Sequence, residues 1–369
     1  MPRSAHLALL FALAAVAAPG CSSCRREGPA TSDDLALVPE TTSLVVKLSV
    51  GRLRDTALWR KLLDLRDRAV AEAKAAAVDG GAPAGEAPPR DYADFVARCA
   101  FDPFQHLDSI FLAFPAEGPS GEFGAVVRGT FDEAKLVACA RAQAKHEGGE
   151  LTVGEHGGHK LYTDPTSGRL FITFLDGKTA LAGGGEWIKG MLDRATGKGA
   201  GPLKSARDNA GLMALVERVR KEDALWVVGQ VAEPIRERLR GNERLAAAGS
   251  LKSLLGSLDF VAGLALTARF ELGAPSDAET LAKQIGEQLT AGKQNPKLML
   301  AGLASLLDRI QIAPEGPVLK ADVKLTQAQV DDLLGRLEGL VRTVDPRPLA
   351  APPVALPPGG FQLQNPLAR

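Results

Sequence analysis

Two histidines and a glutamate lie within five residues, in the run Glu155-His156-Gly157-Gly158-His159. Imidazole nitrogens and carboxylate oxygens are ligands that zinc accepts in proteins. However, Gly157-Gly158 is typical of a turn between two strands, and no further ligand lies nearby in the sequence. The run also differs from the helical His-Glu-x-x-His pattern of metalloproteases. We therefore predict a solvated hairpin tip, with a metal site at Glu155, His156 and His159 as the alternative, and we predict no cofactor.

Motifs for nucleophilic catalysis and phosphate binding are incomplete. The run Gly118-Pro119-Ser120-Gly121-Glu122 ends in Glu where the nucleophile elbow Gly-x-Ser-x-Gly needs Gly. Gly197-Lys198 and Gly292-Lys293 lack the Ser or Thr that follows a P-loop lysine and binds magnesium. Gly183-Gly184-Gly185 precedes a predicted helix and could bind an anion, but Glu186 would repel it, so a tight turn is predicted. No catalytic residue is predicted.

An export signal is predicted at the N-terminus. Residues 7–18, LALLFALAAVAA, form an unbroken apolar run that ends at Pro19-Gly20 and is followed at once by Cys21. A helix that crosses a bilayer needs roughly 20 apolar residues, so this run is too short to be a membrane span. Its length and the preceding Arg3 are typical of a signal peptide, which we assign to residues 1–20.

The sequence Ala18-Pro19-Gly20-Cys21 resembles the lipobox of bacterial lipoproteins, although Ala18 stands where leucine is usual. In that family the signal is cleaved before the cysteine, whose thiol and amine are then acylated. The resemblance covers residues 1–21 and implies lipidation of Cys21. Because Ser22 follows instead of Asp, it also implies an outer-membrane lipoprotein that faces the periplasm or the cell surface. The alternative is a secretory signal cut after Ala17 or Ala18, which gives a secreted or periplasmic soluble protein.

Two further cysteines, Cys99 and Cys139, follow the predicted signal and tether. Export leads to an oxidising compartment, where pairs of cysteines usually bond. With Cys21 acylated and Cys24 in the tether, we predict a disulfide between Cys99 and Cys139. Closing a loop of about 40 residues stabilises a fold by roughly 3–4 kcal/mol in the chain-entropy account. The alternative is two buried free thiols.

The charge balance excludes nucleic acid as a partner. Lys+Arg and Asp+Glu both number 44 among 369 residues, and nucleic-acid binding needs a basic excess. Hydrophobic residues make up 45% and charged residues 24%, as in folded proteins, and the length indicates about two domains. The partners expected are the membrane, through the lipid anchor, and another envelope protein.

The predicted organisation follows from shifts in composition. It comprises a signal peptide (1–20), a flexible tether (21–34), a first domain (35–200) with a disordered loop (78–90), a second domain (205–344) and a disordered tail rich in proline (345–369). Strands are predicted at 43–50, 108–115, 122–130, 151–153, 159–162, 170–175, 179–182, 224–231, 260–272, 309–312 and 318–325. Helices are predicted at 52–77, 132–146, 186–195, 211–220, 277–290, 298–307 and 327–341.

A strand–cap–helix unit recurs at 122–146, 260–290 and 318–341. Each junction carries a capping-box pattern, at Thr130 to Glu133, Ser276 to Glu279 and Thr326 to Gln329. We interpret the recurrence as an internal repeat. Hairpins between the units imply antiparallel pairing. The predicted fold class is therefore α+β, with two antiparallel sheets that are each covered by helices on one face.

Val38-Pro39 through Trp59, and the turn at Asp102-Pro103, resemble uncharacterised exported bacterial proteins, and this resemblance implies no activity. The first functional hypothesis is a lipid-anchored cell-envelope protein that acts as a non-catalytic binding or structural module. The alternatives are a periplasmic enzyme of the hydrolase type, with a dispersed site between the domains, and a soluble ligand-binding protein.

Overall fold

The structure, a computed structural model, describes most of the region between residues 33 and 343. The described residues are 33–61, 63–64, 66–68, 71, 95–96, 99–116, 122–146, 148–163, 170–198, 203–242, 246–296, 299 and 304–343. The predicted signal peptide, Cys21, the loop 78–90 and the tail 345–369 lie outside these residues, as does the tether up to residue 32.

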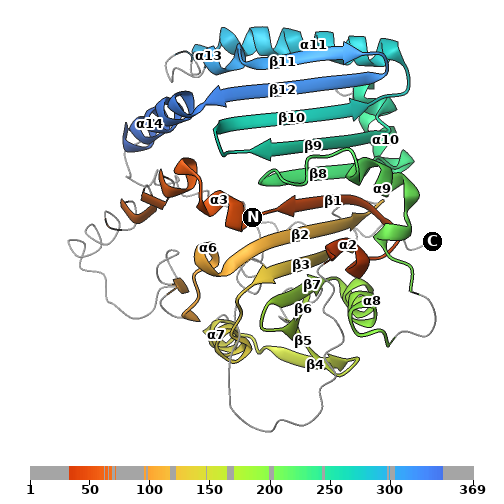
Figure 1. Ribbon diagram of the computed structural model, residues 1–369, viewed down its shortest axis with the longest axis vertical. Coiled ribbons are helices and arrows are strands. Elements are labelled where there is room, and N and C mark those ends of the chain that lie inside the picture. Colours follow the sequence, from red (N-terminus) through yellow and green to blue (C-terminus); the bar gives the residue numbers. More distant parts are fainter. Residues whose placement is uncertain are drawn as a thin grey trace, which may run out of the picture.

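The described strands form one antiparallel sheet of 12 strands, in the order β11-β12-β10-β9-β8-β1-β2-β3-β7-β6-β5-β4 (Figure 1). The strands are β1 (Thr42–Leu48), β2 (Leu107–Pro115), β3 (Gly124–Gly129), β4 (Thr152–His156), β5 (His159–Thr163), β6 (Phe171–Asp176), β7 (Thr179–Gly183), β8 (Leu225–Gln230), β9 (Ser253–Asp259), β10 (Gly263–Glu271), β11 (Ile310–Glu315) and β12 (Val318–Thr326). The mixed α/β composition and the antiparallel pairing agree with the prediction from the sequence.

One sheet takes the place of the two sheets that we predicted. β1 pairs with β8 from Leu44 with Gly229 to Leu48 with Leu225, and this ladder joins strands of the first predicted domain to strands of the second. Both strands are apolar along most of their length and need a neighbour on each side. The pairing joins residues about 180 positions apart, so no local pattern signals it.

The helices are short, apart from four. They are α2 (Asp34–Leu37), α3 (Val50–Arg54), α6 (Pro103–His106), α7 (Glu133–His146), α8 (Gly185–Thr196), α9 (Ala210–Val216), α10 (Glu233–Arg240), α11 (Pro275–Lys293), α13 (Ala304–Leu307) and α14 (Gln327–Thr343), with 3-10 turns at Ala206–Asp208 and Ala246–Ser250. Residues 57–61 and several described positions up to 71 are also helical. Within the described ranges, none of the helices combines the length and apolar character of a membrane span.

Besides the one-turn helices α2 and α6, the elements missed from the sequence include β9 and α10. The strand predicted over 260–272 is the second half of a hairpin, in which β9 pairs with β10 from Ser253 with Glu271 to Asp259 with Ala265. The apolar pair Phe260-Val261 lies in the turn and hides the break between the two strands. α10 is rich in charge, with the sequence EPIRERLR, and therefore lacks the apolar pattern that indicates a buried helix.

Only one of the three predicted capping boxes forms. At α14 the Thr326 N–H donates to Gln329 Oε1 at 2.9 Å, and the Gln329 N–H donates to Thr326 Oγ1 at 3.4 Å. At α7 the capping acceptor is Asp132 Oδ1, 2.9 Å from the Lys135 nitrogen. α11 begins one residue before Ser276, and Asp277 accepts from the Ala274 N–H at 3.1 Å.

The sheet has two faces with different coverings. We call one the α8 face; its strand residues form the floor of the largest core and include Val45, Phe111, Val126, Leu181, Trp226, Val228 and Leu255. α2, α8 and α9 pack on this face, in front of the sheet in Figure 1. We call the other the α7 face; α7 packs there on strand residues that include Ala125, Val127, Ile172, Phe174 and Ala180.

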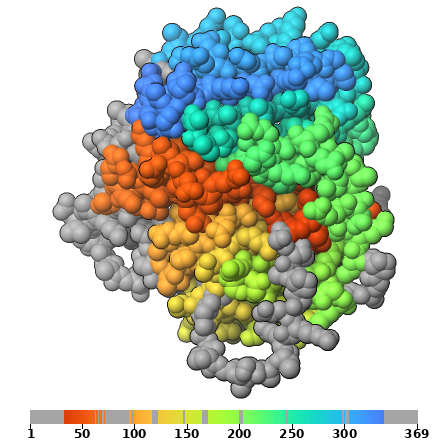
Figure 2. Space-filling view, in the orientation of Figure 1, coloured from red at the N-terminus to blue at the C-terminus, as the bar shows by residue number. Residues whose placement is uncertain are grey.

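The described helices that cover the half of the sheet formed by β9 to β12 lie on the α7 face. α11 packs on Phe270 and Leu319, and α14 packs on Leu264 and Leu325. Of the described helices, none stands in front of β9, β10 and β12 on the α8 face (Figure 1). In the space-filling view this half, in cyan and blue, is continuous with the rest of the molecule (Figure 2).

A repeat is present, but its units differ from those predicted. β1, a helical segment, β2, β3 and α7 follow one another in the same order as β8, α10, β9, β10 and α11. The two units meet at the β1–β8 pair, where Val46 faces Val227. From there the ladders run outward in matched rows, through Leu112 and Ala125 in one unit and through Gly256 and Ala268 in the other. The arrangement is that of two copies related by an approximate two-fold axis normal to the sheet.

Candidate functional site

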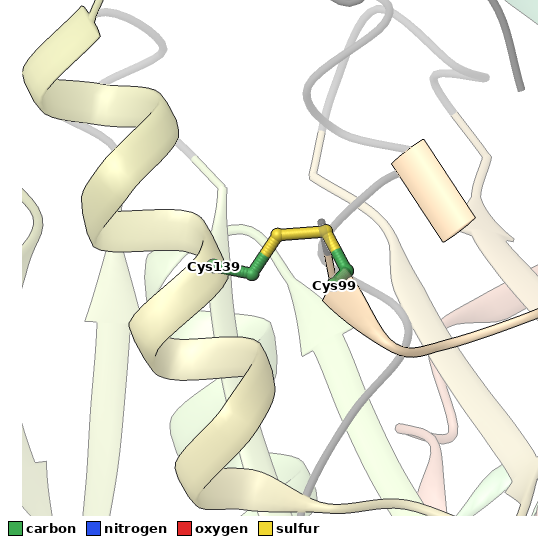
Figure 3. The surroundings of a disulfide bond; sticks show 2 residues. All are labelled: Cys99 and Cys139. Carbon is green, nitrogen blue, oxygen red and sulfur yellow. A yellow bond between two sulfur atoms is a disulfide. The ribbon is translucent and has the colours of Figure 1, made fainter. Parts of the chain in front are cut away.

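The two cysteines predicted to pair lie at disulfide distance, with their Cα atoms 5.2 Å apart (Figure 3). Disulfides in proteins usually span 4.4–6.8 Å between Cα atoms. Cys99 is buried and ends a short helical stretch, whereas Cys139 lies in the middle of α7. The link therefore attaches α7 to the segment that precedes β2, on the α7 face of the sheet.

The first described residues, 33–40, form what we call the N-terminal clasp. Asp33 begins α2, and its Oδ1 accepts a hydrogen bond from the Leu35 N–H at 3.2 Å. Leu35, Leu37 and Val38 are buried in the core of the α8 face. The composition predicts that Asp33 and Asp34 belong to the flexible tether, but both residues belong to the folded domain.

Asp34 lies at the centre of a buried ionic cluster. Its side chain is 4% exposed, and Oδ2 is 2.7 Å from Lys47 Nζ on β1. Oδ1 accepts from Arg128 Nε at 3.1 Å and Nη2 at 3.0 Å, on β3. Arg128 Nη1 also donates to Thr179 Oγ1 on β7 at 2.9 Å. A carboxylate with so little exposure is tolerated because two cations and several hydrogen bonds replace its water.

A second set of contacts binds the clasp to residues 204–209. Asp33 pairs with Arg207, Glu40 pairs with Lys204 at 3.0 Å, and Pro39 forms a β-bridge with Ser205. The Ala206 N–H donates to the Val38 carbonyl at 2.9 Å. The chain entering the domain is therefore fixed to two strands through Asp34, and to the region before α9 through backbone bonds and ion pairs.

The histidine hairpin is present, with Gly157 and Gly158 at φ of 58° and 84° between His156 and His159. Both imidazoles contact protein groups: His156 Nε2 is 2.8 Å from Asp193 Oδ1 on α8, and His159 Nδ1 is 3.3 Å from the Phe174 carbonyl oxygen. Glu155 points to solvent. In the part of the chain that the structure describes, no group of three His, Cys, Asp or Glu residues has the arrangement to hold a metal. The geometry gives the hairpin a structural attachment to α8.

The glycine-rich turn before α8 is occupied by a protein carboxylate. Glu122 Oε2 accepts from the Trp187 N–H at 3.1 Å, and Oε1 accepts from the Glu186 N–H at 3.4 Å. A carboxylate at a helix N-terminus takes the place of an external anion and stabilises the helix dipole. Glu122 lies more than 60 residues before α8 in the chain, so no local pattern indicates this contact.

Tyr162 and Glu133 form a further polar contact, between β5 and α7. The Tyr162 hydroxyl donates to Glu133 Oε1 at 2.6 Å. Burial, and then the hydrogen bond to Glu133, raise the pKa of Tyr162 well above its usual range. The phenol therefore stays neutral at any ordinary pH and acts as a donor that attaches α7 to the sheet.

The ionic cluster at Asp34 was missed from the sequence, although a signal was present. Lys47 and Arg128 are charged residues within otherwise apolar strands, LVVKL and GAVVRG. A charge at a buried strand position needs a partner of opposite sign. That partner, Asp34, sits in the acidic pair Asp33-Asp34, which resembles solvated tether.

Comparisons with known proteins give little further information. No protein-family profile and no curated protein matches the chain. Among solved structures, two crystal forms of TP0453, a Treponema protein, are similar to this chain at TM-scores of 0.42 and 0.44 and sequence identities of 12% and 13%. The alignments cover 84% and 83% of this chain and 98% of TP0453. At these TM-scores the likeness supports no conclusion about fold or function.

Proposed function

We propose that this chain is a lipid-anchored protein of the cell envelope that acts as a non-catalytic binding or structural module. The observation that carries the proposal is the apolar run 7–18 with Cys21 directly after its Pro19-Gly20 break, twelve residues before the N-terminal clasp. The proposed lipid on Cys21 would place the protein on the outer membrane, because Ser22 follows the cysteine.

The clasp supports this role because an anchored protein must transmit the pull of its tether to its core. From Cys21 to Asp33 an extended chain reaches about 40 Å, since each residue spans at most roughly 3.5 Å. The tether ends at buried apolar residues and at Asp34, whose ion pairs with Lys47 and Arg128 cross to two strands. A pull on the tether is therefore resisted by the core of the α8 face, and not by a frayed terminus.

The polar groups of the described domain support a role without catalysis. The two histidines of the hairpin, the Asp34 carboxylate and the Tyr162 hydroxyl each contact a protein group that fixes one element to another. A Cys99–Cys139 disulfide leaves neither thiol as a nucleophile. The near-neutral charge disfavours electrostatic attachment to anionic lipids, so the acyl chains would supply the membrane affinity.

Metabolic labelling with a radiolabelled fatty acid tests the anchor. We expect label in the wild type and in the matched variant Cys24→Ala, and none in Cys21→Ala. Intact mass of the mature protein should show an N-terminus at Cys21 that carries acyl groups. Equal labelling of Cys21→Ala, or a mature N-terminus at Ala18 or Pro19, would contradict the proposal and indicate an ordinary secretory signal.

Membrane fractionation tests the predicted address separately. In a density gradient the wild type should follow the outer membrane, and Ser22→Asp should move it to the inner membrane. Both forms should remain acylated, so a change of position would report sorting and not loss of the anchor. An unchanged position of Ser22→Asp would argue against the outer-membrane assignment.

A further inference from the structure

The sheet has two edge strands, and they are protected to different degrees. β11 is the edge of the C-terminal half and β4 is the edge of the N-terminal half, at the top and the bottom of Figure 1. An edge strand carries backbone N–H and C=O groups that lack a partner strand, and proteins usually guard such groups against unwanted pairing.

β11 is guarded in two ways. In its hairpin with β12 the closing pair is Glu315 with Val318, so Ile310, Ile312 and Pro314 direct their backbone groups away from β12. Pro314 has no N–H, which removes one donor from the outer edge. α11 also packs along this strand, because Ile312 contacts the apolar cluster that contains Leu281 and Ile285 of the helix.

β4 has neither protection. His156 and His159 form the closing pair with β5, so Val153 and Glu155 direct their backbone groups outward. Residues 152–155 are exposed, and Val153 is 43% exposed. Among the described residues, no backbone or side-chain group forms a hydrogen bond with the outer backbone groups of Val153 or Glu155. Glu155 holds the position, next to the closing pair, that Pro314 holds in β11.

The open edge is held in place by its hairpin tip. His156 Nε2 lies 2.8 Å from Asp193 Oδ1, and Lys198 Nζ donates to the Gly157 carbonyl at 3.0 Å. These contacts matter because, in the described part of the chain, β5 pairs with β6 at two positions, Tyr162 and Thr163. Binding to an edge that is already ordered costs less conformational entropy than binding to a mobile strand.

We propose that β4 is a docking edge that takes an extended segment of a partner protein as one more antiparallel strand. Backbone bonds to Val153 and Glu155 would supply affinity, and the two side chains would select a β-branched residue opposite Val153 and a basic residue opposite Glu155. A second copy of this chain fits less well, because symmetric pairing about Gly154 sets Val153 against the other copy's glutamate. The proposal specifies the binding role proposed above and does not depend on the lipid anchor.

A synthetic peptide tests the edge directly. The probe is a fluorescein-labelled nonapeptide, Thr-Lys-Thr-Val-Thr-Lys-Thr-Val-Thr, which places lysine and valine two positions apart on one face of a strand. It is titrated with the mature chain that carries Cys21→Ser and followed by fluorescence anisotropy. A twin peptide with the same side chains and N-methyl groups at alternate backbone positions cannot form the ladder. We expect the first peptide to bind and the twin to bind at least tenfold more weakly. Hydrogen exchange in the complex should slow at 153 and 155.

Substitutions at the two equivalent edge positions, Glu155 on β4 and Pro314 on β11, sharpen the test. Glu155→Pro removes the outward N–H of β4, as Pro314 does in β11, and should weaken peptide binding at least tenfold. Glu155→Gln keeps the N–H and should weaken binding no more than threefold. Circular dichroism and a cooperative thermal transition show that Glu155→Pro is folded. Pro314→Val opens β11 and should leave binding at β4 unchanged.

Several results would overturn the docking edge. They are equal binding of the methylated twin, exchange protection away from residues 152–156, and binding that Glu155→Pro does not change. A dimer in sedimentation that Glu155→Pro dissolves would instead assign β4 to a second copy of this chain. Because the assay uses a chain without an acyl group, these results are independent of the outcome of fatty-acid labelling.

Discussion

The two halves of the sheet share one topology but differ in how many of their faces are covered by helices. In the half from β1 to β7, helices pack on both faces. The two large core clusters, of 21 and 16 buried residues, lie mainly in this half, and the first extends onto β8 and β9 through Trp226, Val228 and Leu255. In the part from β9 to β12, the described helices α11 and α14 cover the α7 face only, and their two clusters contain three buried residues each. The second half therefore depends on the first for much of its stability.

The α8 face of the second half carries polar side chains where no described helix covers it. Thr267, Arg269 and Lys320 lie there in the positions that apolar residues hold in the first half. Ser257 is bonded to Thr267 across β9 and β10 at 3.1 Å, which satisfies hydroxyls that no helix covers. Polar cross-strand pairs thus stabilise this face, whereas in the other half α8 and α9 stabilise it by burying apolar side chains.

Truncation of one phenylalanine in each half gives the largest contrast. Phe111 on β2 is 1% exposed and packs edge to face with Trp226, at 6.3 Å between ring centroids. Phe111→Ala should cost about 3–5 kcal/mol of unfolding free energy, the usual range for a buried Phe. Phe270→Ala, on the half-buried surface under α11, should cost about 1–2 kcal/mol. Urea titration measures both, and equal losses would contradict the comparison.

Removal of the disulfide tests whether the first half also depends on a covalent link. The double variant Cys99→Ala with Cys139→Ala opens a link across 40 positions, which should cost roughly 3–4 kcal/mol. The wild type in reductant should lose a similar amount. Non-reducing mass spectrometry is the check on the link, which is absent if both thiols alkylate without reductant.

Asp34→Ala tests the clasp. The change leaves Lys47 and Arg128 half-covered without their carboxylate, and should cost about 2–3 kcal/mol because charges in the core have lost their partner. The matched control is Asp108→Ala, which removes an exposed pair with Arg54 and should cost less than about 1 kcal/mol. Thermal denaturation compares the two. A loss at Asp34 no greater than that at Asp108 would show that the clasp is not bound through its charge.

The smallest expected effect is the alkaline response of Tyr162. Its pKa is raised in the folded state by burial and by the Glu133 carboxylate, so the folded protein favours the neutral phenol. The stabilisation is fully present below about pH 10, the ordinary pKa of tyrosine, and is lost as pH rises further. Tyr162→Phe should lower stability by about 1 kcal/mol at neutral pH and reduce the decline above pH 10. An unchanged decline would assign the alkaline response to other groups.

The elements were largely predictable because most strands and helices carry their own pattern. SLVVKLSV and DSIFLAFP are apolar, rich in β-branched or aromatic residues and bounded by polar residues or turns, and they became β1 and β2. Cys99 and Cys139 were paired from their number and expected compartment, and the structure places them at disulfide distance. These inferences needed only local sequence and simple counting.

The assembly of those elements was not predictable in the same way. The β1–β8 ladder, which merges two predicted sheets into one, joins residues 44–48 with 225–229 and has no local signature. Asp34 was misplaced because an acidic pair beside a tether resembles solvated chain, and only the fold brings Lys47 and Arg128 to it. Glu122 at the start of α8 was missed for the same reason.

The central position of β1 has a consequence for how the chain matures. Of the described strands, β1 is synthesised first, and its partner β8 follows about 180 residues later. Synthesis or export that starts at the N-terminus therefore exposes the apolar strand β1 early. The edge of β1 that pairs with β8 stays unpaired until about half of the protein has followed. Such long-range closure is slow and leaves nascent chains prone to aggregation. We expect newly made chains to need a holding chaperone until residue 230 has emerged.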